Sequence, residues 1–140
     1  MDYDLKSGIQ VGVALNIGSI SSDTTTQGVI LDSESVDLRT FKSAVFTLVT
    51  GTITDGDYAL KLEYGEESDL SDAVDVPEVE LIGSLPTFTA DTDDNKALSV
   101  GYVGKKRYFR ASVVSTNTST GGVVGVLIVK GNPSYQPVGA

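Results

Sequence analysis

The octapeptide DYALKLEY, residues 57–64, places an apolar or aromatic side chain at every second position. These side chains belong to Tyr58, Leu60, Leu62 and Tyr64. Successive side chains of a β-strand point to opposite faces of its sheet, so a period of two is typical of a strand with one buried face and one face in water. The segment therefore predicts an amphipathic strand and, with it, a protein built on sheets.

The segments around this strand are also strand-like. They are IQVGVALNI (9–17), SAVFTLVTGTI (43–53), ALSVGYV (97–103), RYFRASVV (107–114) and GGVVGVLIVKG (121–131). In the first of them, alternation predicts one shared apolar face made of Ile9, Val11, Val13, Leu15 and Ile17. Residues 43–53 are more apolar, with Val45, Phe46, Leu48 and Val49 close together, which favours a central strand covered on both faces.

Turn signals separate these segments. The stretch TDGDY (54–58) contains Asp55-Gly56, a pair typical of a β-hairpin turn, and TNTSTGG (116–122) joins two further strands. The spacing predicts about eight strands in one antiparallel β-sandwich of jelly-roll type, spanning residues 1–140. At most one short helix is expected, near 67–75, with Ser68 as its cap. The ends, 1–8 and 131–140, are expected to be flexible or ordered by a partner.

Composition excludes several kinds of chemistry. The chain has no histidine and no cysteine, so zinc catalysis and Ser-His-Asp or Cys-His catalysis are excluded. Its nineteen carboxylates make some close pair inevitable by chance, so such a pair is no sign of a glycosidase. Glycine-rich phosphate loops and nucleophile elbows are also lacking. We therefore expect a protein that is not an enzyme and needs no cofactor, metal or small-molecule substrate.

Half of the ten basic residues lie between residues 96 and 110. Three interpretations are open for this stretch: a nucleic-acid-binding site, a turn whose charged side chains lie in water, or a contact with another protein. Alternation divides the charges between two faces, and the net charge of −9 repels phosphate, so we do not expect nucleic-acid binding. The candidate protein-contact residues here are Lys105, Lys106, Arg107, Tyr108 and Arg110.

Residues 63–94 hold eleven Asp or Glu and no Lys or Arg. Asp91, Asp93 and Asn95 are spaced like the start of a calcium loop, but Lys96 and Tyr102 stand where that loop needs glycine and glutamate. A solvated acidic loop and a contact with basic residues of another chain remain as interpretations. For the second, the candidate contact residues are Glu66, Glu67 and Asp69.

Residues 41–138 contain a TDG-Y turn, an acidic E-SD loop, a GY-G-KRY-R strand, a TGG turn, an apolar strand and a proline-bearing tail. In this order the motifs resemble a group of small proteins encoded in the head modules of tailed bacteriophages and prophages. Residues 1–40 are similar to that group only in general character. The resemblance implies a virion structural protein, similar to the β-sandwich cement or decoration proteins that bind the outside of a phage capsid.

Several expectations follow from this resemblance. The partners would be the major capsid protein and further copies of the chain, as a homodimer or homotrimer, with no membrane involved. The chain would be made in the host cytoplasm and reside on the capsid exterior. The family has no catalytic residues to transfer, and Tyr135 of the tail is a further candidate contact. Two alternatives stay open: another virion component, such as a head-tail connector, tail or fibre-base protein, or a surface-binding module of the virion.

Overall fold

The computed structural model describes residues 6–32, 41–89, 94–104 and 106–133 of the chain. These ranges contain eleven strands, of which the longer ones are β1 (Ile9–Ile20), β2 (Thr24–Gln27), β4 (Phe41–Ile53), β5 (Asp57–Gly65), β9 (Ala97–Tyr102), β10 (Tyr108–Thr116) and β11 (Gly122–Pro133). The shorter ones are β3 (Leu31–Asp32), β6 (Val74–Asp75), β7 (Leu81–Ile82) and β8 (Thr87–Thr89). Two single turns of 3₁₀ helix, η1 (Lys6–Gly8) and η2 (Glu78–Glu80), are also described.

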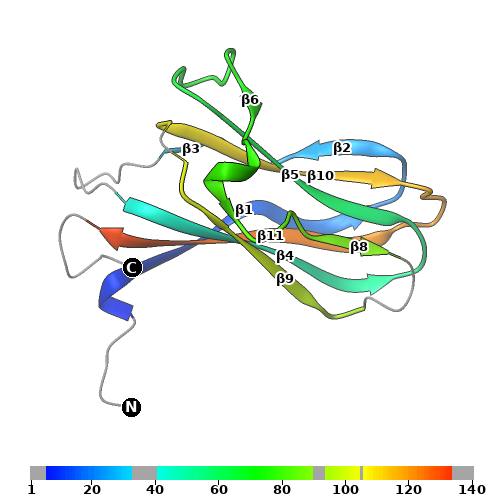
Figure 1. Ribbon diagram of the computed structural model, residues 1–140. Helices are drawn as coiled ribbons and strands as arrows, with labels where there is room; N and C mark the ends of the chain where they lie inside the picture. Colours follow the sequence, from blue (N-terminus) through cyan, green and yellow to red (C-terminus); the bar gives the residue numbers. More distant parts are fainter. Residues whose placement is uncertain (1–5, 33–40, 90–93, 105, 134–140) are drawn as a thin grey trace.

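The strands form two antiparallel sheets that pack face to face (Figure 1). The five-stranded sheet has the order β1-β11-β4-β9-β7. The six-stranded sheet has the order β2-β10-β5-β6, with β3 also paired to β10 and β8 also paired to β5. The predicted all-β sandwich is thus confirmed, and this strand order is compatible with a jelly roll.

The core lies between the two sheets and follows the alternation of the strands. In β5 the residues Tyr58, Leu60, Leu62 and Tyr64 are all buried, as predicted from DYALKLEY. Phe46 of β4 is fully buried, and its ring lies 5.8 Å from the ring centroids of both Tyr102 and Phe109, in edge-to-face arrangement. Burying an aromatic side chain of this size stabilises the fold by about 2–3 kcal/mol.

The prediction of one apolar face for β1 is wrong. Leu15 is buried, whereas Val11, Val13 and Ile17 are about half or more exposed. Two register shifts against β11, on either side of Leu15, account for this, because each bulge turns the following side chains to the other face of the sheet. As a result Ala14 and Leu15 both face the core.

The prediction that β4 is covered on both faces is also wrong. Phe46 and Leu48 point into the core and are fully buried. Val45, on the opposite face, is 39% exposed, and Val49 is only partly buried. In the described part of the chain, no layer covers the outer side of this strand.

The Asp55-Gly56 turn does not form the predicted hairpin. Its flanking strands, β4 and β5, belong to different sheets, so the turn crosses from one layer to the other. Gly56 does have the positive φ, +98°, that such a turn needs. The backbone N–H groups of Thr54 and Asp55 donate to the carbonyl of Gly121 instead of pairing the two strands.

The expected helix near 67–75 is absent from the structure, which has turns there. Leu70 is buried but has a φ of 54°, which interrupts any α-helix. The carboxylates of Asp69 and Asp72 accept backbone N–H groups of this segment, so the backbone has partners outside a helix. The nearest helical turn is η2, and Val74 belongs to β6.

The predicted ends are described only in part. Residues 6–8 form η1, and residues 131–133 belong to β11. Tyr135 and Lys105 lie outside the described residues.

Candidate protein-contact surfaces

Arg110 is used within the chain. It lies on β10 directly opposite Glu63 of β5, on the outer face of the six-stranded sheet. The guanidinium Nη2 is 3.2 Å from the Glu63 Oε1, and each side chain is only 14% exposed. A pair this well covered fixes the alignment of two strands and presents little surface to another protein.

Arg107 also has an acidic partner in its own chain. Its Nε and Nη2 each donate to a carboxylate oxygen of Asp32 at 3.0 Å, which ties the start of β10 to β3. The guanidinium lies 5.1 Å from the ring centroid of Tyr108.

Lys130 of β11 also contacts Asp32. The backbone carbonyl of Asp32 accepts a hydrogen bond from Lys130 Nζ at 3.1 Å. Burial lowers the pKa of Lys130, and the charge of Asp32 opposes that shift.

Lys106 lies close to the acidic segment. Its Nζ is 5.3 Å from the centroid of the Tyr64 ring, a cation–π distance. The pKa of Asp72 is lowered chiefly by the backbone N–H of Glu66, and the charge of Lys106 lowers it further. The basic and acidic stretches of the sequence therefore meet inside one chain at Arg110–Glu63, and the charge of Lys106 acts on the carboxyl of Asp72.

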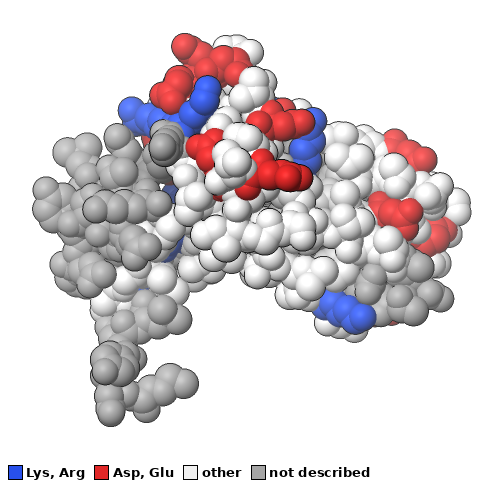
Figure 2. Space-filling model, viewed as in Figure 1, with Lys and Arg blue, Asp and Glu red and all other residues white. Residues whose placement is uncertain are grey.

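The acidic segment, residues 66–80, runs from the end of β5 through β6 to the end of η2. Its first part, the loop before β6, projects from the body of the molecule (Figure 1). Glu66, Glu67 and Asp69 are exposed, as expected for contact residues. The N–H of Ser71 donates to Asp69 at 2.9 Å and lowers the pKa of that carboxyl. Figure 2 shows the carboxylates of this part of the surface gathered together, with basic side chains at the margin. The segment is thus an ordered turn that directs negative charge outward.

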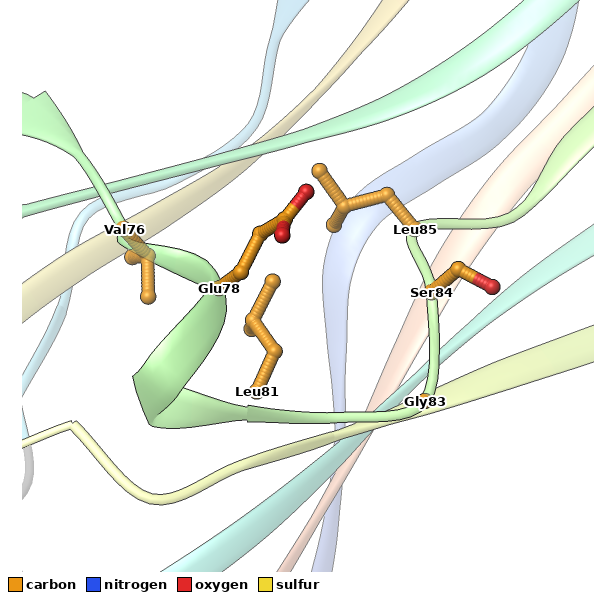
Figure 3. A pocket seen from close by; sticks show the side chains of 6 residues that line it. All are labelled: Val76, Glu78, Leu81, Gly83, Ser84 and Leu85. Atoms are coloured by element: carbon orange, nitrogen blue, oxygen red, sulfur yellow. The ribbon is translucent and has the colours of Figure 1, made fainter.

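A pocket of about 470 Å³ opens beside η2 (Figure 3). Its lining consists of Val76, Glu78, Leu81, Gly83, Ser84 and Leu85. The side chains of Glu78, Leu81 and Leu85 point toward one another across it, so that a carboxylate stands at an aliphatic wall (Figure 3). Such a lining suits the methylene stem and the cation of a lysine or arginine side chain.

Glu80, the last residue of η2, is hydrogen-bonded to Tyr64 of β5. The Tyr64 hydroxyl donates a hydrogen bond to the Glu80 carboxylate. That hydrogen bond, together with burial, raises the pKa of Tyr64 to about 12. Glu78, and not Glu80, is among the residues that line the pocket.

A third surface was not expected from the sequence. It is the outer side of the five-stranded sheet, where Val11, Val129, Val45, Gly101 and Ile82 stand side by side across all five strands. The next row contains Val13, Leu127, Thr47 and Ser99. We call this surface the apolar face, and its apolar members are Val11, Val13, Val45, Val49, Ile82, Leu127 and Val129. A groove of about 630 Å³ runs over part of it.

The sequence did carry a signal for the apolar face. Strands β4 and β11 are apolar at both odd and even positions, which means that each strand has two apolar sides. That pattern is typical of a strand buried on both faces, but it is equally produced by one buried side and one open apolar side.

No group of three or more Asp or Glu side chains is placed to hold a metal ion among the residues that the structure describes. Within the same ranges, no helix has the length and apolar character needed to cross a bilayer. No family model matches the chain, and no similar protein was found among curated proteins.

Proposed function

We propose that this chain is a structural protein of a bacteriophage virion. In this proposal it is a cement or decoration protein, which binds the outer face of the head and bridges subunits of the major capsid protein. The order of motifs in residues 41–138 supports the phage assignment. The observation that carries the adhesive role is the ordered acidic segment, presented by a two-sheet body, with a pocket in which the Glu78 carboxylate stands beside aliphatic side chains.

The acidic segment is the proposed capsid attachment site. Glu66 and Glu67 direct charge outward, and the Glu78 pocket accepts a basic side chain of a capsid subunit. The backbone of the segment is already fixed by Asp69 and Asp72, so little conformational entropy is lost on binding. Complementary charge also speeds association and selects the partner.

Binding alone is enough to stabilise a shell. A ligand that binds only the assembled state stabilises it by about 2.7 kcal/mol when its concentration is 100 times its Kd. Since a capsid repeats the same site many times, and a copy that bridges two subunits holds both, small contributions multiply.

Electron cryo-microscopy of virions whose genome encodes this chain tests the proposal. We expect density with the shape of this sandwich on the outside of the shell. Particles made without the gene should release DNA at a lower temperature. Density inside the head, in the tail or at the portal would contradict the proposal.

Charge variants test the attachment site itself. Glu67→Gln with Glu78→Gln should reduce the occupancy of heads at least about tenfold, since two partner cations lose their counter-charges. The matched control, Thr25→Lys with Thr87→Lys, changes the net charge equally on exposed positions of the six-stranded sheet. Equal losses for the two double variants would show that only net charge matters.

A further inference from the structure

We infer that the apolar face is the surface through which two copies of this chain pair. Several of its members are open to solvent: Val11 is 59% exposed, Val45 is 39% exposed and Ile82 is 65% exposed. Its other members include Val49, Leu127 and Val129, which are partly buried. These residues are neighbours in register and not scattered, so they form one contiguous patch. Contiguous apolar patches of this kind mark interaction sites.

Charge favours a second copy as the occupant. The outward positions of the two rows across the five strands include no Asp, Glu, Lys or Arg. Elsewhere two copies with a net charge of −9 would repel each other, but here they can approach without opposing carboxylates. Depletion of charge in the centre of the patch is also the composition that distinguishes protein interfaces.

The outer side of the five-stranded sheet is close in area to the surface that each partner buries in a standard protein interface. The five strands have 12, 12, 13, 6 and 2 residues. With a rise of about 3.4 Å per residue and about 4.8 Å between strands, one face of this sheet covers about 700 Å². A stable interface of standard size buries about 800 Å² per partner, so the face is close to the size that a dimer needs.

The geometry suits a symmetric pair. Two twisted sheets pack face to face about 10 Å apart with their strands about 30° from parallel. In a two-fold dimer each copy contributes the same patch, so Val45 and Val129, in the middle of the row, would form the centre. The pairing would leave Glu66, Glu67 and Asp69 free, because they lie in the turn before β6, at the edge of the other sheet. The Glu78 pocket lies beside β7, at the edge of the paired sheet.

This inference deepens the proposed function by stating how copies associate, but its test needs no capsid. The experiment is sedimentation of the purified chain over a range of concentrations. Val45→Lys, and separately Ile82→Lys on the short edge strand β7, should each weaken the dimer at least about tenfold. The matched control is Val114→Lys, the same substitution on the outer face of the six-stranded sheet, which should leave the dimer unchanged.

Circular dichroism and thermal unfolding establish that each variant folds. Both lysines replace exposed side chains and can extend into water, so we expect the monomers to keep the native spectrum. A monomeric wild type at high micromolar concentration would overturn the inference, as would equal weakening by Val114→Lys. If the wild type is monomeric but Val45→Lys loses binding to heads, the face serves the capsid and not a second copy.

The dependence of association on salt concentration distinguishes an apolar interface from an ionic one. Pairing through the apolar face should persist or strengthen from low to high sodium chloride, because salt screens the repulsion between two acidic copies. Association of the basic stretch of one copy with the acidic segment of another should weaken as salt rises. A dimer that dissociates in high salt would therefore contradict the inference.

Discussion

The outer faces of the two sheets differ in the kind of side chain that they carry. On the six-stranded sheet, basic and acidic side chains are paired across strands, as in Arg110–Glu63 at 3.2 Å and Lys61–Asp75 at 3.9 Å. On the five-stranded sheet, the apolar face presents valine and isoleucine to solvent. The comparison teaches that Lys106, Arg107 and Arg110 of the basic stretch are engaged within the chain, whereas residues that look like core in the sequence are left open.

The largest expected effect is on the charged side. Arg110→Ala should lower the free energy of unfolding by about 3 kcal/mol, because it leaves the mostly buried Glu63 carboxylate without its partner. Urea unfolding at neutral pH measures this.

The control for that prediction replaces both partners. Arg110→Met with Glu63→Leu should recover most of the loss, since an apolar pair of similar volume leaves no unpaired charge. If Arg110→Ala costs less than about 1 kcal/mol, the pair is weak and the contrast between the two faces loses its energetic basis.

The next largest effect on stability is expected at Asp55, in the connection between β4 and β5 that joins the two sheets. Asp55 belongs to neither outer face, so its variant provides a reference for the variants of both faces. The Asp55 carboxylate accepts the N–H groups of Ser119, Thr120 and Gly121 and the Ser119 hydroxyl, and these bonds hold its pKa well below the ordinary 3.8. A group with a lowered folded-state pKa stabilises the fold fully above its unfolded pKa and loses that contribution as the pH falls further.

Stability should therefore decline from about pH 4 downward. In Asp55→Asn the part of this decline that belongs to Asp55 disappears, and the variant is less stable than the wild type at pH 7. Unfolding curves at several pH values compare the two chains. Parallel stability profiles for wild type and variant would contradict this assignment.

A smaller effect is expected at Arg107. Its pair with Asp32 has the bidentate geometry of a strong interaction, but the side chains are 45% and 35% exposed. Arg107→Ala should cost about 0.5–1 kcal/mol, as is usual for a pair open to water. Thermal unfolding should show a shift well below that of Arg110→Ala, and a shift as large would place Arg107 in the same class as Arg110.

The smallest effect on the fold is expected on the apolar face. Val45→Ala should change the unfolding free energy of dilute protein by about 0.5 kcal/mol or less, because the side chain is partly exposed. If copies pair, the cost should grow with protein concentration. A loss of several kcal/mol in dilute protein would mean that Val45 is a core residue after all.

Local patterns predicted the local structure well. The alternation in DYALKLEY identified the buried side of β5. A period of two needs no knowledge of the partner strand. The bulges beside Leu15 could not be predicted, because a bulge depends on how β1 fits against β11.

The connections between strands and the partners of the charged residues could not be predicted from local patterns, because they depend on residues that are distant in the sequence. The pair Asp55-Gly56 suits a hairpin turn and a connection between two sheets equally well. The connection observed here is stabilised by residues 119–121, which are more than sixty positions away in the sequence. In the sequence alone, the acidic stretch is consistent with a solvated loop or with a contact for basic residues of another chain. The topology, which places β10 beside β5, determines that Arg110 meets Glu63 in the same chain.

The position of β11 has a consequence for synthesis. It is the last described strand in the sequence, yet it lies between β1 and β4. Until it is made, both of those strands have a bare hydrogen-bonding edge, and bare edges recruit other chains. A nascent chain stopped before residue 122 would thus expose two such edges and be prone to aggregate. The five-stranded sheet can therefore form only after residues 122–133 have been made.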